Sequence, residues 1–143
     1  MEKGYRHWGH DITDEDSPLE AGLGFAVAWK KSDFLGRESL LRQREQGVGR
    51  KLVQVALRDT EPLLFHNEPI LRDGEIVGRI TSGMFGHTLR RSIGMGYIAN
   101  AHGKADEQFV VNGAYEVEVA GKRFAADVQL RGFYDPTNLR VKA

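Results

Sequence analysis

Apolar and polar residues alternate with a period of two through most of the chain after Lys51, and turn-forming residues interrupt the alternation at short intervals. Successive side chains of a β-strand point to opposite faces of its sheet, so this alternation predicts strands and not helices. In the first such segment, residues 53–58, large apolar residues alternate with Gln54, Ala56 and Arg58. We expect one face of this strand to be buried and the other to be wet, that is, exposed to solvent.

Two short turns predict β-hairpins. Asp73-Gly74 lies between two apolar pairs, and both turn residues tolerate the positive φ that a two-residue hairpin requires. Farther along, the alternating residues 115–119 are followed by a turn at residues 120–122 and by a second alternating segment at residues 124–128. Many short antiparallel strands at this spacing are typical of a small barrel or a sandwich.

The first third of the chain lacks the alternation and predicts a different kind of structure. Residues 1–23 follow neither the strand period nor the helix period, which indicates an irregular or partly helical N-terminal segment. Residues 24–31 predict a strand. Residues 36–46 predict one short helix, with Asp33 as its cap, two adjacent leucines facing the core and Gly47 at its end. The expected fold class is therefore mainly β (α+β).

Composition narrows the range of functions. The 143 residues are enough for one domain with a hydrophobic core. The 20 Lys and Arg residues balance the 20 Asp and Glu residues, so a large positive field for nucleic acid is absent. No apolar run approaches the roughly 20 residues that a membrane-spanning helix needs. The absence of cysteine excludes disulfides and thiolate metal sites and fits a reducing compartment, so we expect a cytoplasmic protein.

The start of the chain is dense in aromatic, charged and glycine residues, which is typical of the interior of a motif. We therefore expect further sequence upstream in a parent protein. More short motifs follow this one along the chain. In order, they are Glu-Lys-Gly-Tyr-Arg-His-Trp-Gly-His-Asp at residues 2–11, Ser-Pro-Leu-Glu-Ala-Gly-Leu-Gly-Phe at 17–25, Phe-Leu-Gly-Arg-Glu at 34–38, Gly-Arg-Ile-Thr-Ser-Gly at 78–83 and Phe-Tyr-Asp-Pro at 133–136.

Taken together, these motifs resemble the folate-binding aminomethyltransferase (glycine cleavage T-protein) family, and most of all the C-terminal region of dimethylglycine and sarcosine dehydrogenases or oxidases. The Gly-Tyr-Arg-His-Trp sequence at residues 4–8 favours this flavoprotein branch over the stand-alone T-protein. The resemblance implies a small antiparallel β-barrel domain of about six strands at residues 24–143. Residues 1–23 would then be the end of the preceding folate-binding domain.

The resemblance also implies a function for the parent protein. A flavin-dependent dehydrogenase or oxidase would oxidise an N-methylated glycine, such as dimethylglycine or sarcosine, and pass the one-carbon unit to tetrahydrofolate. The FAD and the residue credited with catalysis lie upstream in such proteins, so we expect no catalytic residue in this chain and no activity of the chain alone. Its partners would be folate and the upstream domains, and apolar surface left exposed without those domains could cause the isolated fragment to associate.

Four residues are candidates for holding tetrahydrofolate. A carboxylate can accept two parallel N–H bonds from the edge of a pterin, and the resemblance implies this role for Glu2. Tyr5 and Trp8 are three residues apart and could stack on an aromatic ligand if the segment coils, although packing is the other interpretation. Lys31 matches the region where the family places a basic residue near the glutamyl tail of the folate, although it could also be a solvated lysine.

Several other interpretations stay open or are excluded. His7 and His10 could share a helical face, but no third ligand can be identified, so we expect no metal site. Ser82 has no histidine placed to activate it, because His87 is too weak a partner to argue from. The chain could instead be the C-terminal part of a stand-alone aminomethyltransferase, or a purely structural barrel. Nucleic-acid binding through a small barrel is the weakest alternative, because the net charge is zero.

Overall fold

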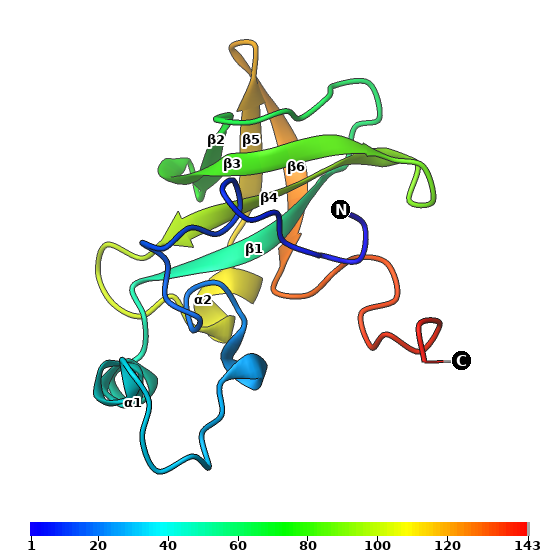
Figure 1. Ribbon diagram of the computed structural model, residues 1–143. Helices are drawn as coiled ribbons and strands as arrows, with labels where there is room; N and C mark the ends of the chain where they lie inside the picture. Colours follow the sequence, from blue (N-terminus) through cyan, green and yellow to red (C-terminus); the bar gives the residue numbers. More distant parts are fainter. Residues whose placement is uncertain (143) are drawn as a thin grey trace.

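The computed structural model describes residues 1–142 and shows a closed, antiparallel six-stranded β-barrel (Figure 1). The strands are β1 (Arg50–Leu57), β2 (Pro69–Arg72), β3 (Glu75–Gly86), β4 (Arg91–Ala99), β5 (Tyr115–Val119) and β6 (Lys122–Gln129). Around the barrel they follow the order β1-β4-β3-β2-β5-β6. Three short helical elements lie outside it, namely η1 (Gly24–Ala26), α1 (Arg37–Gln46) and α2 (Glu107–Val111). The expected mainly β fold is confirmed, and of the two architectures the barrel is observed.

Both predicted hairpins are present. Asp73 and Gly74 join β2 to β3 with φ values of 53° and 90°, in the left-handed region that the sequence pattern required. Ala120 and Gly121 join β5 to β6 in the same way, with φ values of 49° and 76°. Local turn chemistry therefore determines these two strand pairings.

The barrel interior is filled by apolar side chains from all six strands and from α2. Val53 and Val55 of β1 face inward, directly opposite Gly96 and Gly94 of β4. A Cβ atom added at Gly96 would lie 2.3 Å from the carbonyl oxygen of Arg79, so only glycine fits there. The fully buried members of this core are Val53, Val55, Leu57, Leu64, Ile70, Ile80, Ile98, Val110 and Val117.

The outer face of β1 is buried as well, and the prediction of a wet face was wrong. Gln54 is only 3% exposed and Ala56 is fully buried. Residues 1–23, which we call the strap, cross this face of the barrel (Figure 1) and bond to it, as when the backbone N–H of Leu52 donates to the carbonyl oxygen of Glu20. Met95 of β4, the neighbour of Gln54 across the β1–β4 pair, is buried as well. The strap, which is distant from β1 in sequence, thus shields the outer face of β1 from water.

Two further expectations for residues 24–47 were wrong. The predicted strand at residues 24–31 is instead η1 followed by turns, in which the Trp29 indole donates to the carbonyl oxygen of Gly24. The closed barrel leaves no free edge with which an added strand could pair. Helix α1 is capped by Gly36 at φ 82° and not by Asp33, although Gly47 ends it at φ 80° as expected.

Helix α1 also lies away from the barrel, at the lower left of Figure 1. None of its residues is buried, so its two adjacent leucines, Leu40 and Leu41, do not reach the core as predicted. The sequence shows an apolar pair on this helix, but no part of residues 1–142 buries it.

Helix α2 was not predicted. The side chain of Asp106 caps it by accepting a hydrogen bond from the backbone N–H of Phe109 at 2.8 Å, and Val110 packs into the core. An Asp three residues before an apolar pair is a signal that could have revealed it. No helix within residues 1–142 is long and apolar enough to cross a membrane.

Candidate functional site

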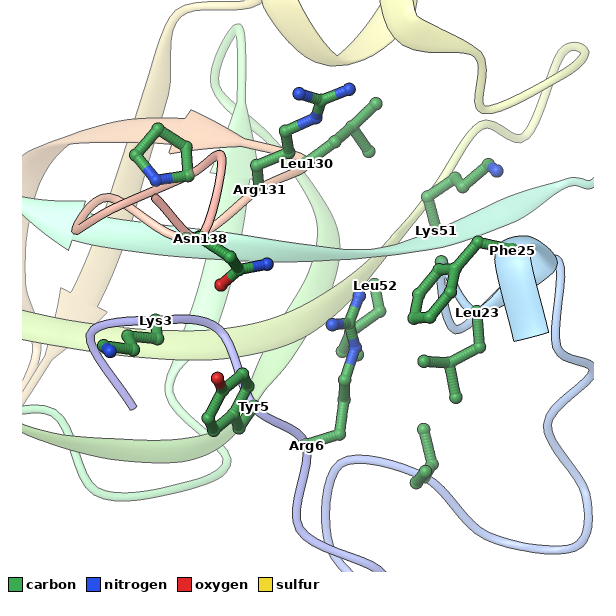
Figure 2. A pocket seen from close by; sticks show the side chains of 14 residues that line it. Lys3, Tyr5, Arg6, Leu23, Phe25, Lys51, Leu52, Leu130, Arg131 and Asn138 are labelled. Atoms are coloured by element: carbon green, nitrogen blue, oxygen red, sulfur yellow. The ribbon is translucent and has the colours of Figure 1, made fainter. Parts of the chain in front are cut away.

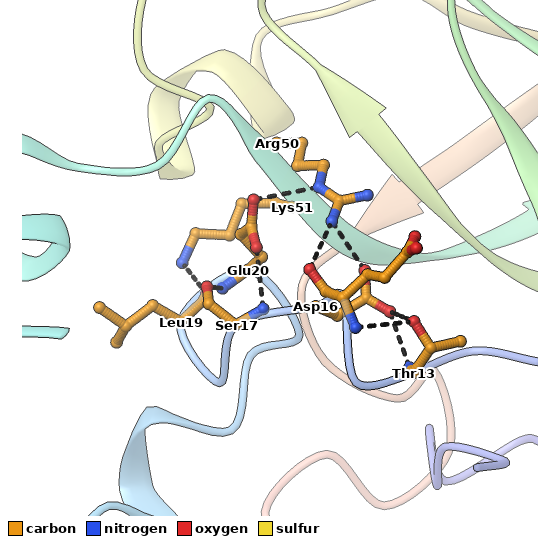
Figure 3. Close-up of polar contacts among 8 residues, drawn as sticks. Thr13, Asp16, Ser17, Leu19, Glu20, Arg50 and Lys51 are labelled. Atoms are coloured by element: carbon orange, nitrogen blue, oxygen red, sulfur yellow. Dashed lines mark hydrogen bonds and ion pairs between the residues drawn. The ribbon is translucent and has the colours of Figure 1, made fainter. Parts of the chain in front are cut away.

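The strap is fastened to the barrel by an ion-paired cluster at the start of β1 (Figure 3). The guanidinium of Arg50 contacts Asp16 at 2.8 Å and Glu20 at 3.0 Å, and it lies 4.8 Å from the ring centroid of Tyr97. Burial would raise the pKa of the Glu20 carboxyl, but hydrogen bonds from the backbone N–H of Ser17 and from Arg50 outweigh this and hold the pKa below its usual value. The cluster fixes the C-terminal half of the strap.

The N-terminal half of the strap is joined to the segment that follows β6. The buried Gln54 amide donates to the carbonyl oxygen of Met1 at 2.6 Å and accepts a hydrogen bond from the backbone N–H of Phe133. The backbone N–H of Tyr134 donates to the carbonyl oxygen of Glu2 at 3.1 Å. One side chain of β1 therefore holds two chain segments side by side across the outer face of the barrel.

A cavity of about 650 Å³, which we call the cationic cavity, opens beside this crossing (Figure 2). Every charged residue in its lining is a cation, and these four are Lys3, Arg6, Lys51 and Arg131. The ring of Tyr5 lies on the strap side of the cavity and the ring of Phe25, from η1, lies near Lys51. The cavity thus presents aromatic surface and positive charge together.

Arg6 is the most constrained of these cations. Its Nε donates to the carbonyl oxygen of Ala21 at 3.2 Å and its Nη1 donates to the carbonyl oxygen of Gly4 at 2.9 Å. Partial burial lowers the pKa of the Arg6 guanidinium, and no carboxylate within residues 1–142 forms an ion pair with it. A half-buried guanidinium that bonds only to carbonyl oxygens leaves positive charge available for an anion.

Glu2 does not line the cationic cavity. Its Oε1 accepts hydrogen bonds from the backbone N–H groups of Thr88, at 2.8 Å, and of Leu89, at 2.9 Å. Burial would raise the pKa of the Glu2 carboxyl, but these N–H groups, led by that of Leu89, hold it below its usual value. The carboxylate therefore stabilises the turn between β3 and β4, and both of these backbone N–H groups donate to Oε1.

The other predicted site residues are dispersed. Tyr5 lines the cationic cavity and is 60% exposed. Trp8 is largely exposed, pairs with Ile12 through an isolated backbone bridge and does not line the cavity. Lys31 is exposed in the turns between η1 and α1. The structure brings only Tyr5 to the cavity, and a direct role in ligand binding stays a prediction for all four residues.

Sequence reasoning missed the cavity's cations, because they come from the strap, from β1 and from the segment after β6. Arg6 stands inside the first motif and could have been found there, whereas Lys51 and Arg131 carry no local signal. Within residues 1–142, no group of three or more His, Asp or Glu side chains is placed to hold a metal ion. The four cations and the rings of Tyr5 and Phe25 suit the cavity to an organic anion with an aromatic part.

Residues 50–135, more than half of the chain, match the glycine cleavage T-protein C-terminal barrel domain. The chain belongs to this family. The GCVT N-terminal domain matches residues 1–31, which include the strap. The family assignment agrees with the motifs noted in the sequence and with the observed barrel.

Relatives of this T-protein barrel include much longer proteins. Mouse sarcosine dehydrogenase, mitochondrial, is 44% identical over 99% of the chain, which covers 16% of that protein. The 4-methylaminobutanoate oxidase (formaldehyde-forming) of Paenarthrobacter nicotinovorans is 41% identical over 99% of the chain, which again covers 16% of the relative. The chain therefore spans about a sixth of these relatives and is similar to one part of each.

A solved structure shows the same fold. The glycine cleavage system aminomethyltransferase T from Bartonella henselae superposes with a TM-score of 0.78 at 26% sequence identity, over 94% of this chain and 37% of the other. The T-protein barrel and its strap are thus an arrangement shared with a known aminomethyltransferase.

Proposed function

We propose that this chain is the C-terminal folate-chamber domain of a flavin-dependent N-methylglycine dehydrogenase or oxidase that passes a one-carbon unit to tetrahydrofolate. The observation that carries the proposal is the cationic cavity, in which the ring of Tyr5 lies among four cations. Folate has an aromatic body and a tail of carboxylates, so its chemistry is complementary to this lining. The similarity to sarcosine dehydrogenase supports the choice of enzyme branch.

The chain's own residues would bind and orient the folate. Tyr5 offers a ring face for stacking, and Lys3 and Arg131 offer charge to the carboxylates of the tail. Glu2, fixed by the turn between β3 and β4, has Oε2 left to accept an N–H group of the pterin. Trp8 and Lys31, which are exposed and do not line the cavity, would complete the chamber against the upstream domains.

Chemical transformation is assigned to groups outside this chain. Tetrahydrofolate, when bound, supplies the amine nitrogens that accept the one-carbon unit, and the FAD of the upstream domains supplies the oxidation. This barrel would hold the folate in position, because holding a reactant in the right geometry is itself a large part of catalysis. Its partners are accordingly the upstream domains of the same parent protein.

Tetrahydrofolate titration into the intact parent protein and its variants tests the proposal. Lys3→Gln and Arg131→Gln remove cavity charges whose side chains form no hydrogen bond with residues 1–142, and each should weaken affinity about threefold. Glu2→Gln keeps an oxygen for the turn while removing the charge, and it should also weaken affinity. Lys122→Gln, at the exposed start of β6, is the matched control. Unchanged affinity in all three test variants would refute the folate role and favour a purely structural barrel.

A stand-alone aminomethyltransferase is the second candidate parent, because a solved T-protein shares the fold over nearly the whole chain. The length of the parent gene separates the two candidates. A gene encoding a flavin-binding domain ahead of these residues would support the dehydrogenase or oxidase, and a gene of T-protein length without one would support the aminomethyltransferase.

A further inference from the structure

A second cavity, of about 460 Å³, shares Tyr5 with the cationic cavity and is lined by the strap, β3 and the loop joining β1 to β2. We call it the aromatic cavity, because rings dominate its lining. These rings belong to Tyr5, His7, His10, Phe65 and His66. Among the described residues no Lys or Arg side chain lines it, so the charge of its lining differs from that of the cationic cavity.

A buried carboxylate lies in the wall of the aromatic cavity. Asp11 is only 1% exposed. Its Oδ2 accepts a hydrogen bond from the backbone N–H of His7 at 2.8 Å, and its Oδ1 accepts one from the hydroxyl of Thr81 at 2.6 Å. Within residues 1–142 no cation forms an ion pair with Asp11. Its negative charge is thus satisfied by hydrogen bonds but not neutralised.

One positive group does belong to a lining residue, namely the α-amino group of Met1. That charge interacts with the carboxylate of Glu2 and helps to lower its pKa, after the hydrogen bonds from Leu89 and Thr88. Arg6 is close enough for its charge to interact with that of Asp11, but its guanidinium is hydrogen-bonded to backbone carbonyls. Neither cation pairs with Asp11.

The rings and a thioether at this cavity are unusually exposed. Tyr5 is 60% and Phe65 is 63% exposed, and Met84 is half-exposed beside them. Large apolar groups gathered at a cavity mark a binding surface more often than isolated exposed residues do. The faces of aromatic rings carry partial negative charge, so they attract cations as well as apolar groups.

We propose that the aromatic cavity binds a small methylated ammonium ion. The methyl groups of such an ion suit the ring faces and the thioether of Met84, and its positive charge suits the rings and the Asp11 carboxylate. An anion would be repelled by Asp11, and a strongly hydrated metal cation would find no set of three ligands. The choice of a biological ligand rests on the proposed function, because N-methylated glycines carry a methylated ammonium group.

The test compares choline with 3,3-dimethylbutan-1-ol, which has the same shape but a carbon in place of the charged nitrogen. Each is titrated into the 143-residue chain and followed by the amide NMR signals of Thr81 and Met84. Choline should bind with a dissociation constant on the order of millimolar, and the neutral alcohol about tenfold more weakly. Equal affinity of the two probes, or no response to choline, would overturn the proposal.

A matched pair of aromatic variants locates the site. Phe65→Leu removes a ring from the aromatic cavity and should weaken choline binding about threefold. Phe25→Leu removes an exposed ring from the cationic cavity and should leave choline binding unchanged. The reverse pattern would contradict the assignment to this cavity. Neither probe contains folate, so a failure here would leave the folate proposal standing, and the folate titration could fail while choline still binds.

Discussion

Gly132 packs directly against the backbone of Lys3, and a Cβ atom added at Gly132 would lie 2.5 Å from the carbonyl carbon of Lys3. This contact is the point at which the strap crosses the segment after β6. Gly4, with φ 72°, lies on the strap side of the same crossing, within 3.3 Å of Gly132 if it carried a Cβ. The two segments can approach this closely only because both positions lack a side chain.

Replacing Gly132 with alanine is therefore expected to destabilise the chain by about 1–3 kcal/mol, because two backbones must separate to admit one methyl group. Thermal unfolding of Gly132→Ala should show a clearly lower Tm. Gly49→Ala is the matched control, since a Cβ there meets no atom within 4 Å and its φ is not positive. Equal Tm values for the two variants would show that the crossing is loose in solution.

Gln54→Leu tests the amide that joins the two segments. The substitution leaves the backbone N–H of Phe133 without its partner, at a cost of about 1–3 kcal/mol. It also removes one of the two hydrogen bonds that the carbonyl oxygen of Met1 accepts, the other coming from the backbone N–H of Gly4. Gln129→Leu changes the residue opposite Gln54 on β6, whose hydrogen bond is exposed, and should cost less than about 0.5 kcal/mol. Urea unfolding at neutral pH measures both, and similar losses would contradict the joining role of Gln54.

The elements that the sequence predicted correctly are those whose causes are local. The turns at Asp73-Gly74 and Ala120-Gly121 need only two adjacent residues that accept positive φ, so each hairpin follows from its own stretch of chain. The wet face expected for β1 failed at Gln54, because the strap that buries it lies some 50 residues away in the sequence. Alternation shows which side chains share a face, but not what covers that face.

The candidate site likewise contains residues that the sequence could reveal and residues that it could not. Tyr5 belongs to a recognisable motif and does line a cavity, whereas Lys51 and Arg131 meet it only after the barrel has closed. Glu2 illustrates a third case. The motif marked the residue, but its hydrogen bonds to Thr88 and Leu89 depend on a turn far along the chain. Tertiary contacts, rather than any property of Glu2 itself, therefore determine which of its carboxylate oxygens the turn occupies.

Stability should fall in acid through the paired carboxylates. Hydrogen bonds hold the pKa of Glu20 and of Asp127 below their usual values, in the second case through Arg91 and Arg58 and against the effect of burial. A carboxyl whose pKa is lower in the folded state contributes stability that is complete above its unfolded pKa, about 4, and is lost as pH falls through the folded pKa. Urea unfolding from pH 7 to pH 3 should therefore show declining stability below about pH 4.5.

Glu20→Gln identifies the strap's share of this acid sensitivity. At pH 7 the variant should be less stable by about 0.5–1 kcal/mol, since its pairing with the partly exposed Arg50 is weakened. At pH 3 the variant and the unmodified chain should differ less, because the carboxyl of the latter is then becoming protonated. A constant difference between pH 7 and pH 3 would show that Glu20 acts through packing and not through its charge.

Removal of residues 1–23 should convert the barrel into an aggregating species, even though the family's barrel domain begins at residue 50. The strap bonds to Leu52 and to Gln54, which are almost completely buried on the outer face of the barrel, and its loss would expose them to water. Size-exclusion chromatography and thermal unfolding of residues 24–143 should show association and loss of a cooperative transition. A chain ending at Asn138, which among the described residues lacks only the exposed residues 139–142 beyond the crossing, should remain monomeric and cooperative if the full chain does. A cooperative, monomeric barrel without the strap would instead show that residues 1–23 are not part of its folding unit.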